Sequence, residues 1–407
     1  MATMPKQIVI LGATGSIGQS TLNVIRHAPK DYQVLALTGY QNIEKLIALA
    51  VEFQPAYIVV PDQAAVASFN KYRQNLDLSC QLFIGVDGLV AVATHVKADI
   101  IVAGIVDKAG LRPTLAAARA GKRILLANKE SMVMAGPLFR HAIEHHGAQI
   151  LPIDSEHNAL FQALPSTLQQ TSLIDQQQAE NSGVHSLVLT ASGGPFRHFS
   201  TVELETVTPA QACKHPNWDM GAKVSVDSAS LMNKGLELIE ACYLFGVKES
   251  FIEVVLHPQS IVHSMVSYVD GTTIAHLSHP TMEVPISFGL AWPLRRSSGI
   301  EPLKWSQLLH LDFIPLTPAQ FPCFNLARQA MVAAEQGKSA PIVLNAANEI
   351  AVSLFLDRKI TFTHIPILVE QSLQYFQQAQ VYDLDAILEL DEQVRAFTLS
   401  TAATQKG

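Results

Sequence analysis

The first 155 residues alternate short apolar runs with helical patterns. Seven runs rich in β-branched residues predict strands, namely KQIVILG, YQVLALTG, PAYIVVPD, QLFIGV, ADIIVAGI, KRILLANKE and AQILPID. Between several of them lie Ala-rich or amphipathic segments such as PTLAAARAGK, which predict helices. Apolar strands flanked by helices are typical of a parallel sheet covered on both faces. We therefore predict an α/β fold whose N-terminal domain is a doubly wound, Rossmann-like parallel sheet.

The pattern changes beyond this domain. Residues 166–186 are polar and Gln-rich and predict a linker or an insertion. Strand patterns then occur in SLVLTAS, IEVVLH, SIVHSMVSYVDGTTIAHLS and around ISFGLAW, together with one strong helix, and Asp270-Gly271 favours a hairpin turn. Four helical patterns close the chain. We expect a first domain at 1–155, a central α+β domain at 156–299, a connection at 300–323 and a C-terminal helical bundle at 324–401.

Composition narrows the class of protein. A chain of 407 residues is long enough for two or three domains with a cleft for catalysis. The net charge of −7 argues against binding to nucleic acid, and no apolar run is long enough to span a membrane. The first strand begins near residue 6, which leaves no room for a signal peptide, so we expect a cytoplasmic protein. The four cysteines are far apart, as expected for buried thiols rather than for disulfides or a zinc cluster.

A glycine pattern follows the first predicted strand. The segment GATGSIGQST places Gly12, Gly15 and Gly18 between a strand and a helix, where glycines allow a pyrophosphate to approach the backbone. In this position a dinucleotide site is favoured over a purely structural turn. The second strand ends in ALTGYQN, without the acid that binds the ribose of NAD, so NADP is the better prediction. No cation replaces that acid, although Lys45 follows one helical turn later.

Polar residues also follow later strands. Asn128, Lys129 and Glu130 come after an apolar strand, where either a ligand site or a solvated, salt-bridged loop is possible. Asp154-Ser155-Glu156 stands between another strand and a helix. Either Asp154 or Ser155 is suited to cap that helix, and the two carboxylates are also suited to a metal ion. The local spacing alone favours the cap.

Residues 224–246 predict a helix with two distinct faces. Its core stripe consists of Met232, Leu236, Ile239 and Tyr243. On the opposite side lie Ser230, Asn233, Lys234 and Glu237. This second face is either an ordinary solvent face with an ion pair, or a cluster suited to a phosphate with a carboxylate that reaches a cation.

Two loops have unusual compositions. TASGGPFR places Ser192 and two glycines after a strand, which indicates either an anion cradle or a simple turn. ACKHPNWDMGAK places His215, Trp218 and Met220 among Pro and Gly residues. That loop is either a lid over a ligand or a buried anchor.

Taken together and in order, the segments GATGSIGQST, LLANKES, PIDSEHNA, SGGPFR, HPNWDMG, VDSASLMNKGLELIEA and HPQSIVHSM resemble the 1-deoxy-D-xylulose 5-phosphate reductoisomerase family. The resemblance implies a homodimeric bacterial or plastid enzyme of the non-mevalonate isoprenoid pathway. Such an enzyme isomerises a phosphorylated ketose and reduces the product with NADPH to 2-C-methyl-D-erythritol 4-phosphate. It has an NADPH-binding domain, a catalytic and dimerisation domain and a helical domain.

The resemblance also implies roles for particular residues. Mg²⁺ or Mn²⁺ would be held by Asp154, Glu156 and Glu237. Catalysis would use Lys129, Glu156 and His215. Substrate would contact Lys129, Ser155, Glu156, Ser192, His215, Ser228, Asn233, Lys234 and Glu237. The cofactor would contact Thr14, Gly15, Ser16, Ile17, Gly39, Gln41, Asn42, Asn128, Glu130 and Gly221. A flap over the substrate would contain Trp218 and Met220.

One position departs from the family pattern. After the second strand the family usually has Gly, then Lys or Arg, then Asn, whereas this chain has Tyr40, Gln41 and Asn42. The lost cation weakens the expected discrimination between NADPH and NADH. Two other functions remain as alternatives: an NADP-linked semialdehyde dehydrogenase, which needs an activated cysteine, and a non-catalytic nucleotide-binding protein.

Overall fold

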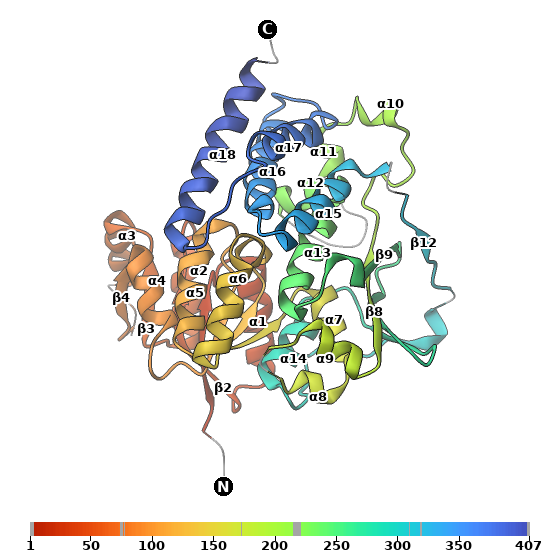
Figure 1. Cartoon of the computed structure of the whole chain (residues 1–407). Coiled ribbons are helices and arrows are strands. Elements are labelled where there is room, and N and C mark those ends of the chain that lie inside the picture. The colour runs from red at the N-terminus through yellow and green to blue at the C-terminus, as the bar shows by residue number, and fades with distance from the viewer. Residues whose placement is uncertain are drawn as a thin grey trace. The chain divides into compact units, whose positions relative to one another are not determined.

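The structure is a computed structural model that describes residues 4–73, 76, 78–171, 173–214, 221–308, 310–317 and 320–404 (Figure 1). The chain divides into two compact units. The first unit comprises Met1–Ser131, Phe139–Asn158 and Thr281–Pro302. The second unit comprises Met132–Leu138, Ala159–Pro280 and Leu303–Gly407. No described helix is both long enough and apolar enough to cross a membrane.

The first unit contains a seven-stranded parallel sheet with the strand order β4-β3-β2-β1-β5-β6-β7. All seven strands predicted from the sequence are present, so the predicted fold class is confirmed. Their bounds are β1 (Lys6–Leu11), β2 (Tyr32–Thr38), β3 (Tyr57–Val60), β4 (Gln81–Ile84), β5 (Ile100–Ala103), β6 (Arg123–Leu126) and β7 (Gln149–Pro152). The strand order changes direction between β1 and β5, and right-handed crossovers then place helices on both faces of the sheet. Ligands of such sheets bind at this switch point.

Helices connect the strands of the first sheet. They are α1 (Ser16–His27), α2 (Ile43–Phe53), α3 (Gln63–Arg73), α4 (Gly85–Ala93), a 3₁₀ turn (Lys108–Gly110), α5 (Leu111–Arg119) and α6 (Lys129–His146). After β7 comes α7 (Ser155–Ala163). The core of this unit is apolar, and the interior residues Ile8, Val9 and Ile10 of β1 are fully buried.

One predicted strand of the central region is a helix. The segment around ISFGLAW forms α14 (Glu283–Ala291), which packs against β6 and β7 of the first sheet. A Cβ on Gly289 would lie 2.9 Å from Leu125, so the helix approaches the sheet closely. A short, wholly apolar run fits a buried helix and a buried strand equally well. The prediction of an edge strand there was therefore wrong.

The second unit contains a mixed five-stranded sheet with the order β11-β10-β8-β9-β12. The bounds are β8 (Val184–Ala191), β9 (Ile252–Leu256), β10 (Val262–Tyr268), β11 (Thr273–Leu277) and β12 (Ile314–Pro315). Only β8 and β9 run parallel; the other pairs are antiparallel. Gly271 has a φ of +87° in the hairpin between β10 and β11, as the Asp-Gly pair predicted.

The remaining elements of the second unit are helical. Two helices precede β8 in the chain, namely α8 (Ser166–Gln169) and α9 (Gln176–Asn181). Between β8 and β9 lie α10 (Thr201–Leu204), α11 (Pro209–Ala212), α12 (Ala222–Ala229), α13 (Met232–Phe245) and a 3₁₀ turn (Glu249–Phe251). A second 3₁₀ turn (Trp305–Gln307) precedes β12. The C-terminal bundle consists of α15 (Pro322–Glu335), α16 (Ala340–Leu356), α17 (His364–Tyr375) and α18 (Leu384–Thr404), as predicted. The Gln-rich segment is structured: α9 begins with a capping box at Asp175.

Residues 224–246 form two helices rather than one. Helix α12 ends at Ala229 and α13 begins at Met232. Between them Leu231 has a φ of +61°, a left-handed conformation that is uncommon for a branched residue. We call residues 227–237 the α12–α13 corner.

Candidate functional site

Close backbone contacts hold the glycine turn after β1. Gly12 has a φ of +85°, and a Cβ there would lie 2.8 Å from Gly104 O. A Cβ on Gly18, in the first turn of α1, would lie 2.5 Å from Ala13 O. The amides of Gly12 and Ala13 donate hydrogen bonds of 2.8 Å to Thr38 Oγ1 and Thr38 O at the end of β2. Glycine is therefore required twice, once for the turn and once for the close contact of α1 with the strand end.

The start of α1 suits an anion. Gly15 is its N-cap and carries no side chain to cap the free amides, and the first turn of α1 contains no acidic residue. Free amides and the positive end of the helix dipole attract a phosphate group. Thr14, Ser16 and Ile17, which were predicted to contact a cofactor, belong to this turn at the topological switch point.

The end of β2 provides mostly neutral groups. Gln41 is exposed, and Asn42 caps α2 by accepting a hydrogen bond of 2.9 Å from the Lys45 amide. The Lys45 ammonium donates a hydrogen bond of 3.0 Å to Thr14 O in the glycine turn. A cation thus reaches the turn from α2, although the position of Gln41 offers none.

Asn128 connects the ends of β5 and β6. Its Nδ2 donates to Ile105 O at 2.6 Å and to Asp107 O at 2.9 Å, and its Oδ1 accepts from the Ser131 amide and caps α6. The side chain is almost fully buried, as is that of Glu130. Asn128 therefore fixes the loop that presents Lys129, which excludes a simple solvated loop at this place.

The ends of β6 and β7 bring Lys129 to the acidic segment. The two strands are paired up to Leu126 and Pro152, and Lys129 Nζ lies 2.8 Å from Asp154 Oδ2. Both side chains are only about one-eighth exposed, at 12% and 13%. Such a pair is held more firmly than a surface ion pair. The charged residues after these two neighbouring strands thus form one cluster.

The Asp154-Ser155-Glu156 segment is more than a helix cap. Ser155 Oγ donates a hydrogen bond of 2.6 Å to Glu156 Oε2. The Asp154 carbonyl accepts the first α-helical hydrogen bond of α7, from the Asn158 amide at 2.9 Å. Fully buried His157 has its Nδ1 3.8 Å from Asp154 Oδ1. Since α7 begins at Ser155, Asp154 rather than Ser155 stands at the N-cap position of this helix.

In the second unit, the loop with Ser192 packs against α12. Gly193 and Gly194 both have positive φ angles, +80° and +66°. A Cβ on Gly194 would lie 2.7 Å from Ser228 O, so only glycine permits this approach. The structure thereby brings together two serines, Ser192 and Ser228, that lie far apart in the sequence and were both predicted to contact substrate.

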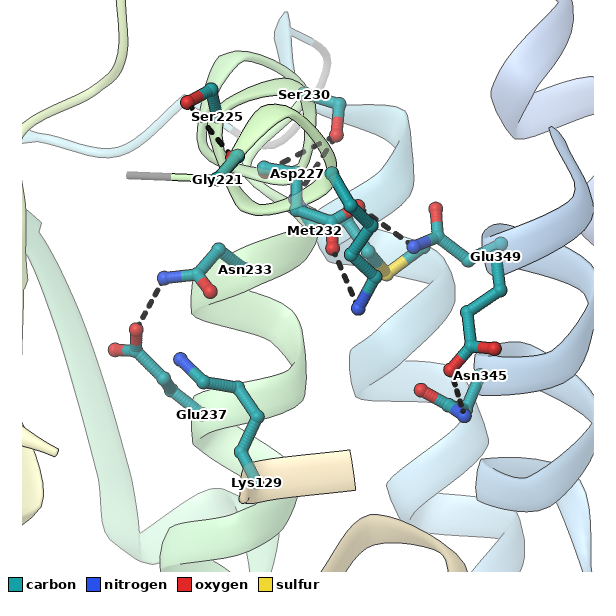
Figure 2. Close-up of polar contacts among 12 residues, drawn as sticks. Lys129, Gly221, Ser225, Asp227, Ser230, Met232, Asn233, Glu237, Asn345 and Glu349 are labelled. Atoms are coloured by element: carbon teal, nitrogen blue, oxygen red, sulfur yellow. Dashed lines mark hydrogen bonds and ion pairs between the residues drawn. The ribbon is translucent and has the colours of Figure 1, made fainter. Parts of the chain in front are cut away.

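The polar side of α13 is buried. Lys234 Nζ donates to Glu237 Oε2, and Asn233 Nδ2 donates to Glu237 Oε1, the second contact being drawn in Figure 2. Lys234 is 4% exposed and Glu237 is 1% exposed. An ordinary solvent face is therefore excluded. Because a buried ion pair contributes little net stability, this arrangement points to function rather than to folding.

The predicted flap lies mostly outside the described residues. His215, Trp218 and Met220 are among the residues that the structure does not describe. Gly221, which follows them, is the N-cap of α12.

The cysteines argue against a thiol nucleophile. Burial raises the pKa of the Cys323 thiol to about 12 and also raises the pKa of Cys80 and of Cys242. A raised pKa keeps the thiol protonated and unreactive. Cys213 is half-buried, and its thiol lies 3.9 Å from Ala222 O.

Sequence reasoning did not single out two buried polar residues. Asp227 is 1% exposed, and Asn348 on α16 donates to it at 2.7 Å. A signal was present in α16, where Asn345 and Asn348 recur three residues apart in a mostly apolar helix. The partner of Asn348 on α12 could not be identified from that pattern.

Comparison with known families agrees with the resemblance. The family model described as 1-deoxy-D-xylulose 5-phosphate reductoisomerase matches residues 8–136. Two models for C-terminal domains of the same enzyme match residues 150–245 and 277–397. The chain belongs to the 1-deoxy-D-xylulose 5-phosphate reductoisomerase family.

Individual members of the reductoisomerase family match almost the whole chain. The enzyme from Pseudomonas fluorescens is 50% identical over 393 residues, 97% of each chain. The enzyme from Pseudomonas aeruginosa is 49% identical over 392 residues, 96% of each chain. A crystal structure of a reductoisomerase with NADPH, fosmidomycin and magnesium matches with a TM-score of 0.91 and 45% identity, covering 98% of this chain and 99% of the other. The Zymomonas mobilis enzyme in complex with NADPH matches with a TM-score of 0.88 and 40% identity, again covering 98% and 99%.

Proposed function

We propose that the chain converts 1-deoxy-D-xylulose 5-phosphate into 2-C-methyl-D-erythritol 4-phosphate in the non-mevalonate route to isoprenoids. The conversion combines a metal-dependent isomerisation with a reduction by NADPH. Membership of the reductoisomerase family over nearly the full chain is the observation that carries this proposal. The relatives crystallised with NADPH and with magnesium support the choice of cofactors.

NADPH supplies the hydride for the reduction. We assign its pyrophosphate to the glycine turn and the start of α1, where backbone amides are free to bind it. The remaining contacts come from Gly39, Gln41, Asn42, Asn128, Glu130 and Gly221. The absence of an acid after β2 leaves room for a 2′-phosphate, and Lys45 brings a cation toward the same turn. NADPH is therefore preferred over NADH even though Gln41 is neutral.

A bound Mg²⁺ or Mn²⁺ ion would act as a Lewis acid and polarise the substrate carbonyl. We propose that Asp154, Glu156 and Glu237 hold this ion. Carboxylates are the hard oxygen ligands that both ions prefer. In the structure, Asp154 is paired with Lys129 and Glu237 with Lys234, so each of these two carboxylates already has a cationic partner within its own unit. These pairs hold the two side chains in place, and three carboxylates are a donor set that fits a divalent cation.

The lysines have separate tasks in this proposal. Lys129 stabilises negative charge that develops on a substrate oxygen during the isomerisation. Ser192, Ser228, Asn233 and Lys234 bind the substrate phosphate, and the close packing of the Ser192 loop on α12 supports their grouping. Binding energy from the phosphate, which is remote from the reacting carbons, then serves to orient the substrate.

The segment that contains His215, Trp218 and Met220 is proposed as a flap that covers the substrate and excludes water. His215 would contact the substrate directly. Cofactor binding is assigned to residues 1–155 and catalysis and dimerisation to residues 156–299, with the helical domain at 324–401 after the connection at 300–323.

We also propose a cytoplasmic homodimer. Strand β11 forms one edge of the second sheet, and an edge strand is suited to pairing with another chain. The relatives are bacterial enzymes. A semialdehyde dehydrogenase is disfavoured, because the raised pKa values of three cysteines oppose a thiol nucleophile.

A single absorbance assay tests the function. We expect the protein to oxidise NADPH when 1-deoxy-D-xylulose 5-phosphate and Mg²⁺ or Mn²⁺ are present. The oxidation of NADPH should stop when a chelator removes the metal. NADH in place of NADPH should react more slowly. If NADPH absorbance does not fall with substrate and either metal present, the proposed function is wrong.

A further inference from the structure

A buried polar contact joins α12 to α16 within the second unit. Asn348 Nδ2 donates a hydrogen bond of 2.7 Å to Asp227 Oδ1, and Lys223 Nζ, one turn earlier on α12, lies 3.1 Å from Asp227 Oδ2. Asn348 is 0% exposed. Both carboxylate oxygens of Asp227 thus have a partner. Burying a carboxylate costs several kcal/mol unless it is paired, so a contact of this kind sets the position of α12 closely.

Asp227 is the first residue of the α12–α13 corner, which is strained. Leu231 holds a left-handed φ, a conformation that costs about 1–3 kcal/mol for a residue other than glycine. Ser230 Oγ donates to Asp227 O at 3.2 Å and accepts from the Met232 amide at 3.3 Å, and so braces the turn. Strain of this kind persists only where the surroundings hold it. Asp227 is held both by the partners of its carboxylate and by the hydrogen bond that its carbonyl accepts from Ser230.

The corner carries the residues assigned to the substrate phosphate. Ser228 follows Asp227 directly, while Asn233 and Lys234 stand beyond Leu231 in the first turn of α13. A small rotation of α12 would therefore separate Ser228 from the two residues of α13. The positions of these side chains relative to one another should strongly affect the affinity for phosphate, because several weak contacts must be made at once.

We propose that Asp227 and Asn348 are positioning residues for the phosphate subsite. They fix α12 on α16, so that the C-terminal helices, to which no substrate contact is assigned, determine how tightly the phosphate is bound. This inference rests on the proposed function for the identity of the substrate, but the phosphate group alone is enough to test it.

Helix α16 offers a matched control. Asn345 stands one turn before Asn348 and is equally buried, at 0% exposed. Its Nδ2 donates 3.0 Å to Glu349 Oε1 within the same helix (Figure 2). Replacing either asparagine by alanine removes one hydrogen bond from the same helix. Only Asn348→Ala breaks the connection to α12.

The experiment compares Asn348→Ala and Asn345→Ala in the full-length protein with NADPH and Mg²⁺. If part of the lost hydrogen-bond energy appears in the position of α12, a tenfold change in binding corresponds to about 1.4 kcal/mol. We expect Asn348→Ala to raise the KM for the ketose phosphate about tenfold, while kcat and the KM for NADPH stay within about twofold. Asn345→Ala should lower the melting temperature similarly and leave the KM unchanged.

A second readout does not require turnover. Inorganic phosphate should raise the melting temperature of the wild type and of Asn345→Ala, but raise that of Asn348→Ala much less. If the wild type fails to oxidise NADPH, the proposed function is wrong, and the phosphate measurement still decides the role of Asn348. Equal phosphate stabilisation in both variants would overturn the positioning role. So would a parallel loss of kcat and NADPH affinity in Asn348→Ala, which indicates general damage.

Asp227→Asn covers the case in which Asn348→Ala does not fold. An asparagine at 227 still accepts from Asn348, but a neutral acceptor bonds more weakly than a carboxylate, so the contact with α16 is weakened rather than removed. We expect a KM for the ketose phosphate raised by about two- to threefold, between the wild type and a full loss of the contact. An unchanged KM and unchanged phosphate stabilisation in this variant would count against the inference.

Discussion

The glycine turn after β1 and the α12–α13 corner are both assigned to phosphate groups, yet they are built differently. The turn uses backbone amides and needs glycines because its own backbone atoms approach one another closely. The corner uses side chains, including a buried Lys234–Glu237 pair and a buried Asp227. One site is made by local backbone geometry, the other by charged groups that are buried in the second unit.

The two sites therefore differ in the free energy of desolvation that is needed to hold them in place. A turn made of amides and a helix dipole needs no desolvated charge to hold it in place. A corner made of buried ions needs partners for each of them, and an ion left without a partner is strongly destabilising. The corner should therefore respond to changes in charge and pH, whereas the turn should respond to changes in volume.

The largest effect should come from a change in charge at the corner. Glu237→Gln removes one proposed carboxylate ligand of the metal but keeps the shape of the side chain. Lewis-acid stabilisation is worth several kcal/mol, so turnover should fall by about a thousandfold or more. NADPH affinity, measured by fluorescence titration, should stay near that of the wild type because Glu237 is not among the residues assigned to the cofactor. Activity close to wild type would remove Glu237 from the metal site.

A change in volume at the glycine turn should have a smaller effect. In Gly18→Ala the new Cβ would lie 2.5 Å from Ala13 O and Gly12 O, so the backbone of the turn must shift. The affinity for NADPH should fall about ten- to a hundredfold, with kcat at saturating NADPH much less affected. Gly15→Ala is the control for packing, because its nearest neighbour is 3.4 Å away and its φ is −80°. Without NADPH, Gly18→Ala should lower the melting temperature and Gly15→Ala should not; equal melting temperatures of the two variants would refute the requirement for close packing.

The same contrast explains how much could be predicted from the sequence. The seven parallel strands and the glycine turn follow from local periodicity and residue type, and all were predicted correctly. Polar groups were predicted at the strand ends, but the pairing of Lys129 with Asp154 was not, because it depends on the order of the strands in the sheet. Local patterns could not show that Lys234 and Glu237 are buried, because α13 is covered by helices distant in sequence, such as α15.

Two further errors have related causes. The segment around ISFGLAW is apolar on all sides, so its period does not separate a helix from a strand. The break at Leu231 was missed because no Gly, Pro or Asn marks it; the surrounding contacts hold a leucine in a left-handed conformation. The metal and substrate roles of particular residues came from the family resemblance, since spacing alone favoured a cap and a solvent face.

The smallest expected effect concerns acid sensitivity of the second unit. Burial lowers the pKa of His263 on β10 to about 4, with further contributions from His276 and Lys234, while the carbonyls of Ser278 and His279 oppose the shift. Since the folded-state pKa is below the ordinary value of 6.5, the unfolded chain binds a proton first as the pH falls. The contribution of neutral His263 to the free energy of unfolding is therefore complete above about pH 6.5 and is lost progressively as the pH falls toward about 4.

His263→Asn removes this titration. Between neutral pH and about pH 5, the wild type should lose about 2 kcal/mol of unfolding free energy more than the variant does, measured by urea denaturation at each pH. The glycine turn contains no titratable side chain, so Gly18→Ala should keep the pH dependence of the wild type even though it weakens NADPH binding. If His263→Asn and the wild type lose stability in parallel, the buried histidine does not account for acid sensitivity. The contrast between the two sites would then rest on the corner's carboxylates and lysines alone.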